Sequence, residues 1–368
     1  MKLVLLRNNL VESLSAVEHS VGMNANLPIL KSVLLRAFEN KILLTTTDLE
    51  IATQSTVPGK IIEDGECSIP FLLLNSIVKN ILSERVSINE EGKKITITTD
   101  NYEAEIQGNN PKDFPLIPSV HDTKHFFKIN SSILRDALSA VSAAVQYSEI
   151  RPEISGVLFK YEKDSLVFVG TDSFRLVEKR VLAKEIETSF EAISMIIPKK
   201  TIEELLRVLG KNDVLVEIFI DPNQVLFKMP AGQIISRLID GNFPEYQGVI
   251  PKEVENELTV DREEMINAIK LTAAFAGRTQ GISMNVKDGK NFLELHSADG
   301  ALGENRYKVP AKIKGGAFSA IFNWKYILDG LRIYAESEIV IGATPGRPAL
   351  IRSSHDASLV YVLMPIKL

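Results

Sequence analysis

Hydrophobic residues recur at three- and four-residue intervals in three stretches of the chain, over 9–20, 131–145 and 261–275. This spacing predicts three amphipathic helices, each with one apolar side that faces a core. Ser131 and Asp261 stand at the start of two of these stretches and belong to the residue types that cap helix N-termini. Both are therefore predicted N-caps.

Alternating apolar and polar positions follow each predicted helix. The first copy of this pattern reads "SVLLRAFENKILLTTTDLEIA", the second "SGVLFKYEKDSLVFVGTDSFRLV" and the third "QGISMNVKDGKNFLELHSADGALG". Because strands place alternate side chains on opposite faces, each copy is predicted to form a strand, a polar turn and a second strand. In each copy a Thr-Asp or Ala-Asp pair follows the second strand, and these aspartates are Asp48, Asp172 and Asp299.

A second helix and further alternating strands complete each copy. The second helices are predicted within 69–85, 197–211 and 323–332. The whole pattern recurs with a period of about 125 residues, which indicates repeated structural units. The segments "PKDFPLIP" and "DGNFPEYQGVIP" follow the last strands of the first and second copies, and their prolines predict extended connectors. The predicted domains are 1–125, 126–253 and 254–368.

The recurring aspartates allow two interpretations. Paired carboxylates carry out acid–base chemistry in glycoside hydrolases, so a hydrolase that uses Asp48, Asp172 or Asp299 is one possibility. An aspartate in a tight turn can also accept hydrogen bonds from nearby backbone amides. Since the same residue type falls at the same place in every copy, turn capping is the simpler interpretation, and the hydrolase is kept as an alternative.

Composition is that of an ordinary globular protein. The chain has 368 residues, of which 45% are hydrophobic and 24% charged, enough for a substantial core. The apolar runs are too short to span a bilayer, and the N-terminus lacks the cleavage site of a secretory signal. Cys67 is the only cysteine, which excludes a disulfide within one chain and a thiolate metal cluster. A cytoplasmic protein with no membrane association is expected.

Catalytic motifs are missing from the sequence. It contains neither a phosphate-binding loop of the P-loop type nor a nucleophile elbow. The five histidines are scattered, and the closest pair, His121 and His125, lies in the proline-bounded connector region, where a solvated linker is a simpler interpretation than a metal pair. No cofactor or metal is predicted, and a scaffold or binding platform is favoured over an enzyme.

Five stretches, in order along the threefold repeat, resemble the DNA polymerase III beta subunit family, the bacterial sliding clamps. They are "LPILKSVLL", "TTDLEI", "GTDSFRL", "SRLIDGNFPEYQGVIP" and "YVLMPIKL". The resemblance covers the whole chain. It implies an α+β fold of three repeated DNA-clamp domains in a head-to-tail homodimeric ring, with sheets outside and helices lining a central hole. It also implies a non-catalytic processivity factor that encircles duplex DNA and tethers the replicative polymerase.

The resemblance also implies a binding cleft for partners. The expected partners are double-stranded DNA, the DNA polymerase III alpha subunit, the clamp loader and other proteins with clamp-binding motifs. Their peptides are expected to dock between the second and third domains, on an adaptable surface of methionine and branched aliphatic residues. The matching residues are Thr171, Arg175, Leu176, Pro244, Val249, Val362, Met364, Pro365 and Ile366. Phe174 and Gln247 differ from frequent family choices, so the partner preference stays open.

Positive charge gathers on the predicted second helices. Each of them carries a net positive charge, although the net charge of the chain is −5. A ring needs cations only where it faces phosphate. The residues expected to face DNA are Asn24, Lys79, Arg151, Lys199, Lys200, Arg207 and Lys325. Asn24, Leu72, Pro152 and Glu153 depart from common family choices, which leaves open the residues that touch DNA. A repeat scaffold unrelated to DNA is the second alternative.

Overall fold

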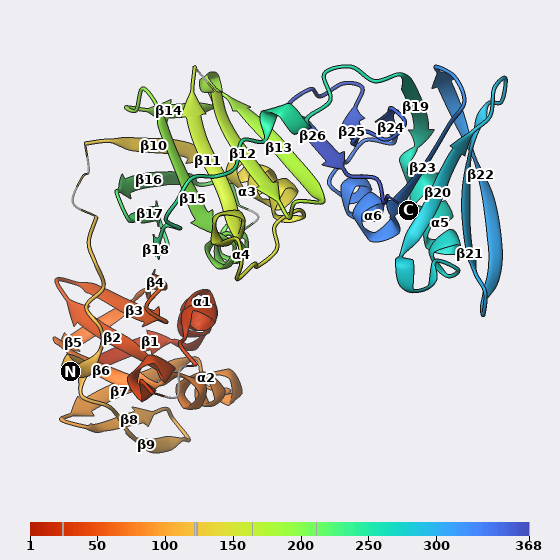
Figure 1. Ribbon diagram of the computed structural model, residues 1–368. Coiled ribbons are helices and arrows are strands. Elements are labelled where there is room, and N and C mark those ends of the chain that lie inside the picture. The colour runs from red at the N-terminus through yellow and green to blue at the C-terminus, as the bar shows by residue number, and fades with distance from the viewer. Residues whose placement is uncertain (24–25, 121, 123, 164, 211, 368) are drawn as a thin grey trace. The chain divides into compact units, whose positions relative to one another are not determined.

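We describe a computed structural model of the chain, which divides into two compact units (Figure 1). Unit 1 comprises 1–134, 185–190 and 203–238, and unit 2 comprises 135–184, 191–202 and 239–368. The structure describes residues 1–23, 26–120, 122, 124–163, 165–210 and 212–367.

Unit 1 contains a five-stranded antiparallel sheet in the order β5-β1-β7-β8-β9. Helices α1 (Arg7–Val17) and α2 (Phe71–Asn80) pack against each other in the same unit. Both helices lie where the apolar periodicity predicts them. The strands are β1 (Lys2–Leu6), β5 (Gly59–Glu63), β7 (Arg85–Glu91), β8 (Lys94–Thr98) and β9 (Glu103–Gln107).

A nine-stranded sheet in unit 1 joins the first copy of the repeat to the second. Its order is β14-β10-β16-β17-β18-β4-β3-β2-β6, and the join is the antiparallel pair β18–β4, in which Ile235 lies opposite Ala52. The strands are β2 (Ser32–Phe38), β3 (Lys41–Thr47), β4 (Ile51–Thr56), β6 (Gly65–Pro70), β10 (Phe126–Asn130), β14 (Ile186–Thr188), β16 (Leu215–Asp221), β17 (Gln224–Met229) and β18 (Gly232–Arg237).

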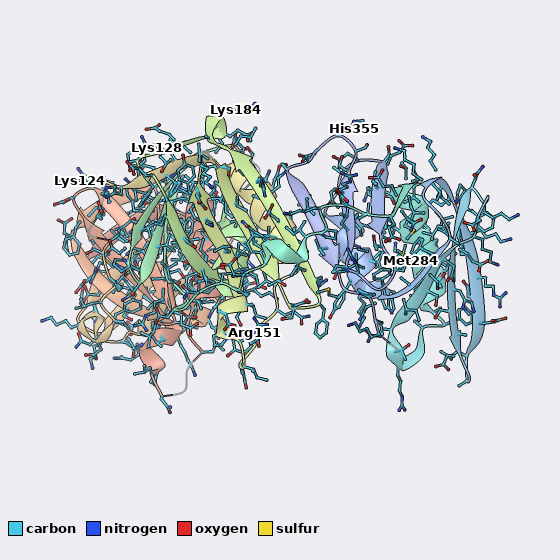
Figure 2. All side chains as sticks on the ribbon, turned by 45° about the horizontal axis from the view of Figure 1, so that its top comes forward. Lys124, Lys128, Arg151, Lys184, Met284 and His355 are labelled. Atoms are coloured by element: carbon cyan, nitrogen blue, oxygen red, sulfur yellow. The ribbon has the colours of Figure 1, made fainter. Side chains whose placement is uncertain are left out.

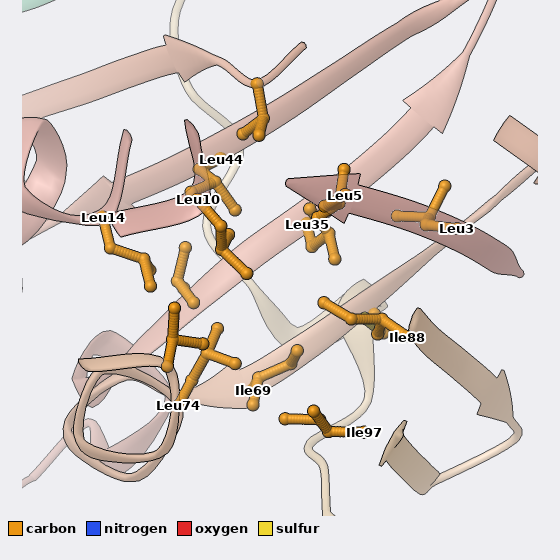
Figure 3. Packing of buried hydrophobic residues seen from close by; sticks show 14 of the residues in the cluster. Leu3, Leu5, Leu10, Leu14, Leu35, Leu44, Ile69, Leu74, Ile88 and Ile97 are labelled. Atoms are coloured by element: carbon orange, nitrogen blue, oxygen red, sulfur yellow. The ribbon is translucent and has the colours of Figure 1, made fainter. Parts of the chain in front are cut away.

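The core of the first copy fills the space between the two helices and the strands around them (Figure 3). Leu10 from α1, Leu74 from α2, Leu35 from β2 and Ile88 from β7 are all fully buried. Burying one such side chain stabilises the fold by about 1.5–3 kcal/mol. The apolar faces of the strands and of the helices therefore form one shared hydrophobic core.

Unit 2 contains a twelve-stranded sheet that joins the second copy to the third. Its order is β15-β11-β12-β13-β26-β25-β24-β19-β22-β21-β20-β23, and in the joining pair β13–β26 Leu176 lies opposite Val362. The strands are β11 (Gly156–Glu162), β12 (Ser165–Thr171), β13 (Arg175–Leu182), β15 (Ile193–Pro198), β19 (Asn256–Asp261), β20 (Gly281–Val286), β21 (Phe292–Asp299), β22 (Gly303–Lys314), β23 (Phe318–Asn323), β24 (Glu338–Ala343), β25 (Ala349–Ser353) and β26 (Leu359–Leu363).

Helices also occur where the repeat predicts them in the second and third copies. α3 (Ser131–Ser142) and α4 (Lys199–Val208) belong to the second copy, and α5 (Arg262–Ala273) and α6 (Trp324–Arg332) belong to the third. In unit 2, α6 packs beside β26 (Figure 1). Among the described residues, no helix has both the length and the apolar character that crossing a membrane requires. The 3₁₀ turns are η1 (Glu18–Ser20), η2 (Pro28–Lys31), η3 (Pro111–Asp113), η4 (Pro152–Ile154), η5 (Ala183–Glu185), η6 (Gln247–Val249) and η7 (Gly277–Thr279).

Candidate functional site

A tight turn between β12 and β13 is held by its own side chains. Asp172 Oδ1 accepts hydrogen bonds from the backbone amides of Phe174 and Arg175 at 2.9 and 3.0 Å. Thr171 Oγ1 donates to the carbonyl of Arg175 at 2.7 Å and accepts from the amide of Ser173 at 3.1 Å. Ser173 has a left-handed φ of 76°. The sequence thus encodes a rigid corner that presents the side chains around it.

The recurring aspartates hold equivalent turns in the other copies. Asp48 Oδ1 accepts from the amides two and three residues later, at 3.0 and 2.9 Å. Asp299 Oδ1 does the same at 2.9 and 3.3 Å. Turn capping, the simpler interpretation of these aspartates, is confirmed in all three copies.

Arg175 connects this turn to α6. Its side chain is buried, Nε donates to Asp172 Oδ2 at 2.9 Å, and Nη1 donates to Asp329 Oδ2 at 2.6 Å. The guanidinium also lies over the ring of Tyr326, 4.5 Å from its centroid. Burial alone would lower the pKa of Arg175, but Tyr361 and the two carboxylates outweigh it and raise that pKa. The guanidinium is therefore a permanent charge in the junction between the second and third copies.

A cavity of about 190 Å³ lies beside this turn in unit 2, at the β13–β26 pair. We call it the β13–β26 cleft. Four segments form it: the loop at 151–154, the turn, the connector that follows β18, and the end of β26. Beyond β26 the chain stays close, because the amide of Met364 donates to the carbonyl of Phe174 at 2.8 Å. The lining residues are Arg151, Ile154, Thr171, Ser173, Phe174, Arg175, Leu176, Pro244, Glu245, Tyr246, Val249, Val362 and Met364.

The wall of the cleft is apolar, with a buried acid close to it. Leu176, Tyr246 and Val362 belong to one buried hydrophobic cluster. Glu178, also buried, has one carboxylate oxygen 2.7 Å from Nε of Arg180. Burial, and after it the interaction with Glu178, raises the pKa of the Tyr246 hydroxyl. The tyrosine is therefore neutral at physiological pH, so the cleft can bury an aliphatic or aromatic side chain of a ligand.

The structure brings most of the predicted partner-binding residues into this lining. They are Thr171, Arg175, Leu176, Pro244, Val249, Val362 and Met364. Pro365 and Ile366 are not among the lining residues, and the amide of Ile366 donates to the carbonyl of Ile321 in β23, at 2.7 Å.

The lining also includes six residues outside the predicted set, namely Arg151, Ile154, Ser173, Phe174, Glu245 and Tyr246. Of these, only Phe174 was already connected with partner preference; it is 60% exposed and stacks on Tyr326 with ring centroids 6.5 Å apart. Tyr246 could have been found, because it and Phe243 are the two aromatic residues of a connector already assigned to the cleft. Ile154 gave no such signal, since it reaches the cleft from a 3₁₀ turn in a polar segment.

The residues expected to face DNA lie mainly on the second helix of each copy. Lys79, in the last turn of α2, is 3.5 Å from Glu18. Lys199 and Lys200 begin α4. Arg207, in its last turn, is 3.3 Å from Glu204. Lys325 is near the start of α6, and Asn24 lies outside the described residues.

Arg151 differs from the other residues expected to face DNA. It is exposed on the loop before η4 (Figure 2). It also lines the β13–β26 cleft. Its Nε is 3.1 Å from Glu153, and its Nη1 donates to Ser173 Oγ at 3.0 Å. This geometry links Arg151 to the cleft wall and not to a helix.

A threefold repeated α+β chain with an apolar cleft at a junction of copies belongs to the class of binding platforms. Family models of the DNA polymerase III beta subunit match it in order: the N-terminal domain over 1–118, the central domain over 128–245 and the C-terminal domain over 247–367. The chain therefore belongs to the DNA polymerase III beta subunit family, as its sequence motifs suggest.

Individual relatives agree along the whole length. The beta sliding clamps of Bacillus subtilis strain 168 and Staphylococcus aureus strain Mu50 are 28% and 27% identical, each over all of this chain and at least 99% of their own. The crystal structure of the B. subtilis sliding clamp has a TM-score of 0.94 at 27% identity, covering 100% of this chain and 99% of that one. A Pseudomonas aeruginosa sliding clamp has a TM-score of 0.94 at 26% identity, with both chains fully covered. The family role is that of a DNA polymerase processivity clamp, a non-catalytic subunit.

Proposed function

We propose that two copies of this chain close head to tail into a ring around duplex DNA, and that the β13–β26 cleft holds the replicative polymerase and other partners on that ring. The observation that carries the proposal is the convergence of the turn, the connector and the C-terminal segment on one apolar cavity. In each chain the three domains would be 1–125, 126–253 and 254–368. The DNA polymerase III alpha subunit, the clamp loader and other proteins with clamp-binding motifs would share the cleft.

Two open strand edges support a head-to-tail dimer. β9 is the last strand of the five-stranded sheet. In β22, residues 303–310 pair with β21 on one side, while only 311–314 pair with β19 on the other. Glu103 and Glu105 on β9 would face Arg306 and Lys308 on β22 with opposite charge. Pairing of unlike edges closes a ring and removes edges that invite aggregation.

Phe275 supplies an apolar contact for the same interface. It lies near Gly303, at the start of β22, and is partly buried. Strand pairing, opposite charges and an aromatic anchor would together stabilise a ring that must stay closed on DNA.

Topology, with weak electrostatics, would hold the DNA. Cations on α2, α4 and α6 would face the phosphates, in a chain whose net charge is −5. Protein loaded by a clamp loader should slide off linear duplex DNA and remain on closed circles. The logarithm of its residual binding constant for DNA should fall linearly with the logarithm of the salt concentration. The slope should be about −0.9 for each phosphate that the protein neutralises. Equal retention on linear and circular DNA, measured by gel filtration, would contradict the ring.

Removing the end of the chain tests the cleft. Deleting residues 364–368 removes Met364 from the lining, and an apolar anchor of this kind is worth roughly 2 kcal/mol or more. Affinity for a peptide from the C-terminal tail of the alpha subunit should fall about thirtyfold or more, while the dimer survives. Calorimetry measures the affinity, and deletion of only 367–368 is the matched control. Full-strength binding by the longer deletion would mean that the peptide binds elsewhere.

A further inference from the structure

A second cavity occupies the corresponding place at the other junction of copies. It has a volume of about 150 Å³, lies in unit 1 at the β4–β18 pair, and is lined by residues of the β3–β4 turn, of the connector at 115–118 and of β18. We call it the β4–β18 cleft. Segments of the same three kinds, namely turn, connector and last strand, also line the β13–β26 cleft, to which the loop at 151–154 contributes as well. The two cavities are thus equivalent positions of the internal repeat.

Their backbones match in detail. Asp48 caps the turn of the β4–β18 cleft with the same two amide hydrogen bonds by which Asp172 caps the other turn. The residue after each aspartate is left-handed, with φ of 81° at Leu49 and 76° at Ser173. Since a leucine rarely adopts this conformation, the turn holds a strained residue at the cavity wall, and such strain is commonest at functional sites.

Exposed aliphatic side chains surround the β4–β18 cleft. Leu116, from the connector, is 92% exposed, and Leu49 is 42% exposed. Ile117 and the buried Ile235 also line the cavity. An apolar cavity of about 150 Å³ is large enough to bind benzene. This cleft therefore has room for one aliphatic side chain of a ligand. The exposed Leu49 and Leu116 could cover that side chain.

A guanidinium marks one edge of the cavity. Arg237 ends β18, is exposed and lines the β4–β18 cleft. Within the described part of the chain, its side chain makes no ion pair or hydrogen bond. Glu50 also lines the cavity and is joined to Arg237 only through a backbone hydrogen bond of 2.9 Å. The free guanidinium fork fits a carboxylate, which it can bind through two parallel hydrogen bonds.

We propose that the β4–β18 cleft is a second docking site, which takes a short extended peptide segment of a partner protein with an aliphatic side chain next to a carboxylate. The aliphatic side chain enters the cavity between Leu116 and Ile235, and the carboxylate pairs with Arg237. The peptide class of the ligand rests on the proposed function of the β13–β26 cleft. A chain with both clefts can hold two partners at once, or two segments of one partner, which raises the effective affinity of the complex.

The test uses the full chain with ¹³C-labelled methyl groups and the synthetic peptide acetyl-Ser-Ile-Glu-Ser-amide at millimolar concentration. Methyl resonances of Leu116, Ile117 and Ile235 should shift with peptide concentration. Replacing isoleucine by alanine in the peptide, or glutamate by glutamine, should weaken this binding at least tenfold.

Variants of the chain separate the two contacts. Leu116→Ser should abolish the shifts of Ile117 and Ile235, whereas Leu72→Ser, which changes another exposed leucine of unit 1, should leave them unchanged. Arg237→Gln should remove the preference for glutamate over glutamine in the peptide. Glu50→Gln should keep that preference.

Two results would overturn the proposal: no shift at these methyls at millimolar peptide, or shifts that survive Leu116→Ser. The proposed function is judged separately, from the Val362 and Met364 methyls and the polymerase-tail peptide. If those respond while Ile117 and Ile235 do not, only the second site is wrong. If the reverse holds, the β13–β26 cleft has been misassigned and the second site stands.

Discussion

Arg175 belongs both to the buried network of the fold and to the lining of the β13–β26 cleft. Its guanidinium is buried against Asp172, Asp329 and Tyr326, and it also lines the β13–β26 cleft. The first carboxylate comes from its own turn and the second from α6, so one side chain ties the second copy to the third. A flexible lysine ammonium could not serve both carboxylates and the tyrosine face with one planar group.

Replacing Arg175 should therefore destabilise the protein strongly. Arg175→Ala leaves the buried Asp172 without its charge partner, and breaking such a pair costs about 3–5 kcal/mol. The two backbone amides that still bind Asp172 put the expected loss near the lower end of that range. Urea unfolding followed by circular dichroism measures it.

The matched control is Arg352→Ala, which breaks an exposed pair with Glu257 and should cost less than about 1 kcal/mol. If both variants lost the same stability, the buried network would have no special role.

Local capping chemistry could be predicted from the sequence only where both partners are neighbours. Asp261 accepts from the amide of Glu264 at 2.8 Å, so its predicted N-cap is confirmed. At Ser131 the structure differs. The helix already includes Ser131, whose hydroxyl accepts from the amide of Val214, while Asp213 accepts from the amide of Ser132. Asp213 lies 81 residues after Ser132, so the sequence around the helix start does not reveal this cap.

At the scale of elements, alternation predicts strands but not their partners. The pairs β4–β18 and β13–β26 join different copies of the repeat, and both clefts lie on these pairs. Their register depends on contacts far apart in the sequence, which no local window contains. Pro365 and Ile366 lie outside the cleft lining for the same reason, because the amide of Ile366 donates to the carbonyl of Ile321 in β23. Their part in partner binding stays a prediction.

Gly232 makes one of these joins possible. It lies in β18 opposite Ser55, and a Cβ there would overlap the carbonyl oxygen of Gln54 in β4. Gly232→Ala should force the two strands apart and destabilise unit 1 by about 1–3 kcal/mol. Thermal unfolding measures the loss. Gly300→Ala, where a Cβ meets open space, is the control and should change little. Equal stability of both variants would mean that β4 and β18 separate without cost.

At the scale of the whole molecule, the repeat could be predicted but the compact units could not. Periodicity indicated three copies, and the family models match three domains in the same order. The compact units instead divide the second copy, because its strands belong to two different sheets. Sheets that continue from one copy into the next tie neighbouring copies by backbone hydrogen bonds. Among the described residues, β9 and residues 303–310 of β22 each keep one side without a partner strand.

The open edge of β9 gives the sharpest test of the dimer. The amide of Gly108 donates to the carbonyl of Lys93, and the amide of Thr99 donates to the carbonyl of Tyr102. In the antiparallel register between these two pairs, every second residue of β9 forms backbone hydrogen bonds with β8. Glu105 lies between these positions, and its amide therefore points away from β8. Glu105→Pro removes an outward donor and leaves the β8–β9 ladder intact, as edge strands allow.

The expected result of Glu105→Pro is a folded monomer. Light scattering should give a mass near 40.8 kDa, against twice that value for the parent chain. Glu105→Ala is the matched control, because it also loses the ion pair with Lys94 yet keeps the backbone donor, and it should stay dimeric. Monomers from both variants would make the side chain, and not strand pairing, responsible for assembly. Dimers from both would place the interface on another edge, and the ring would then have to close without β9.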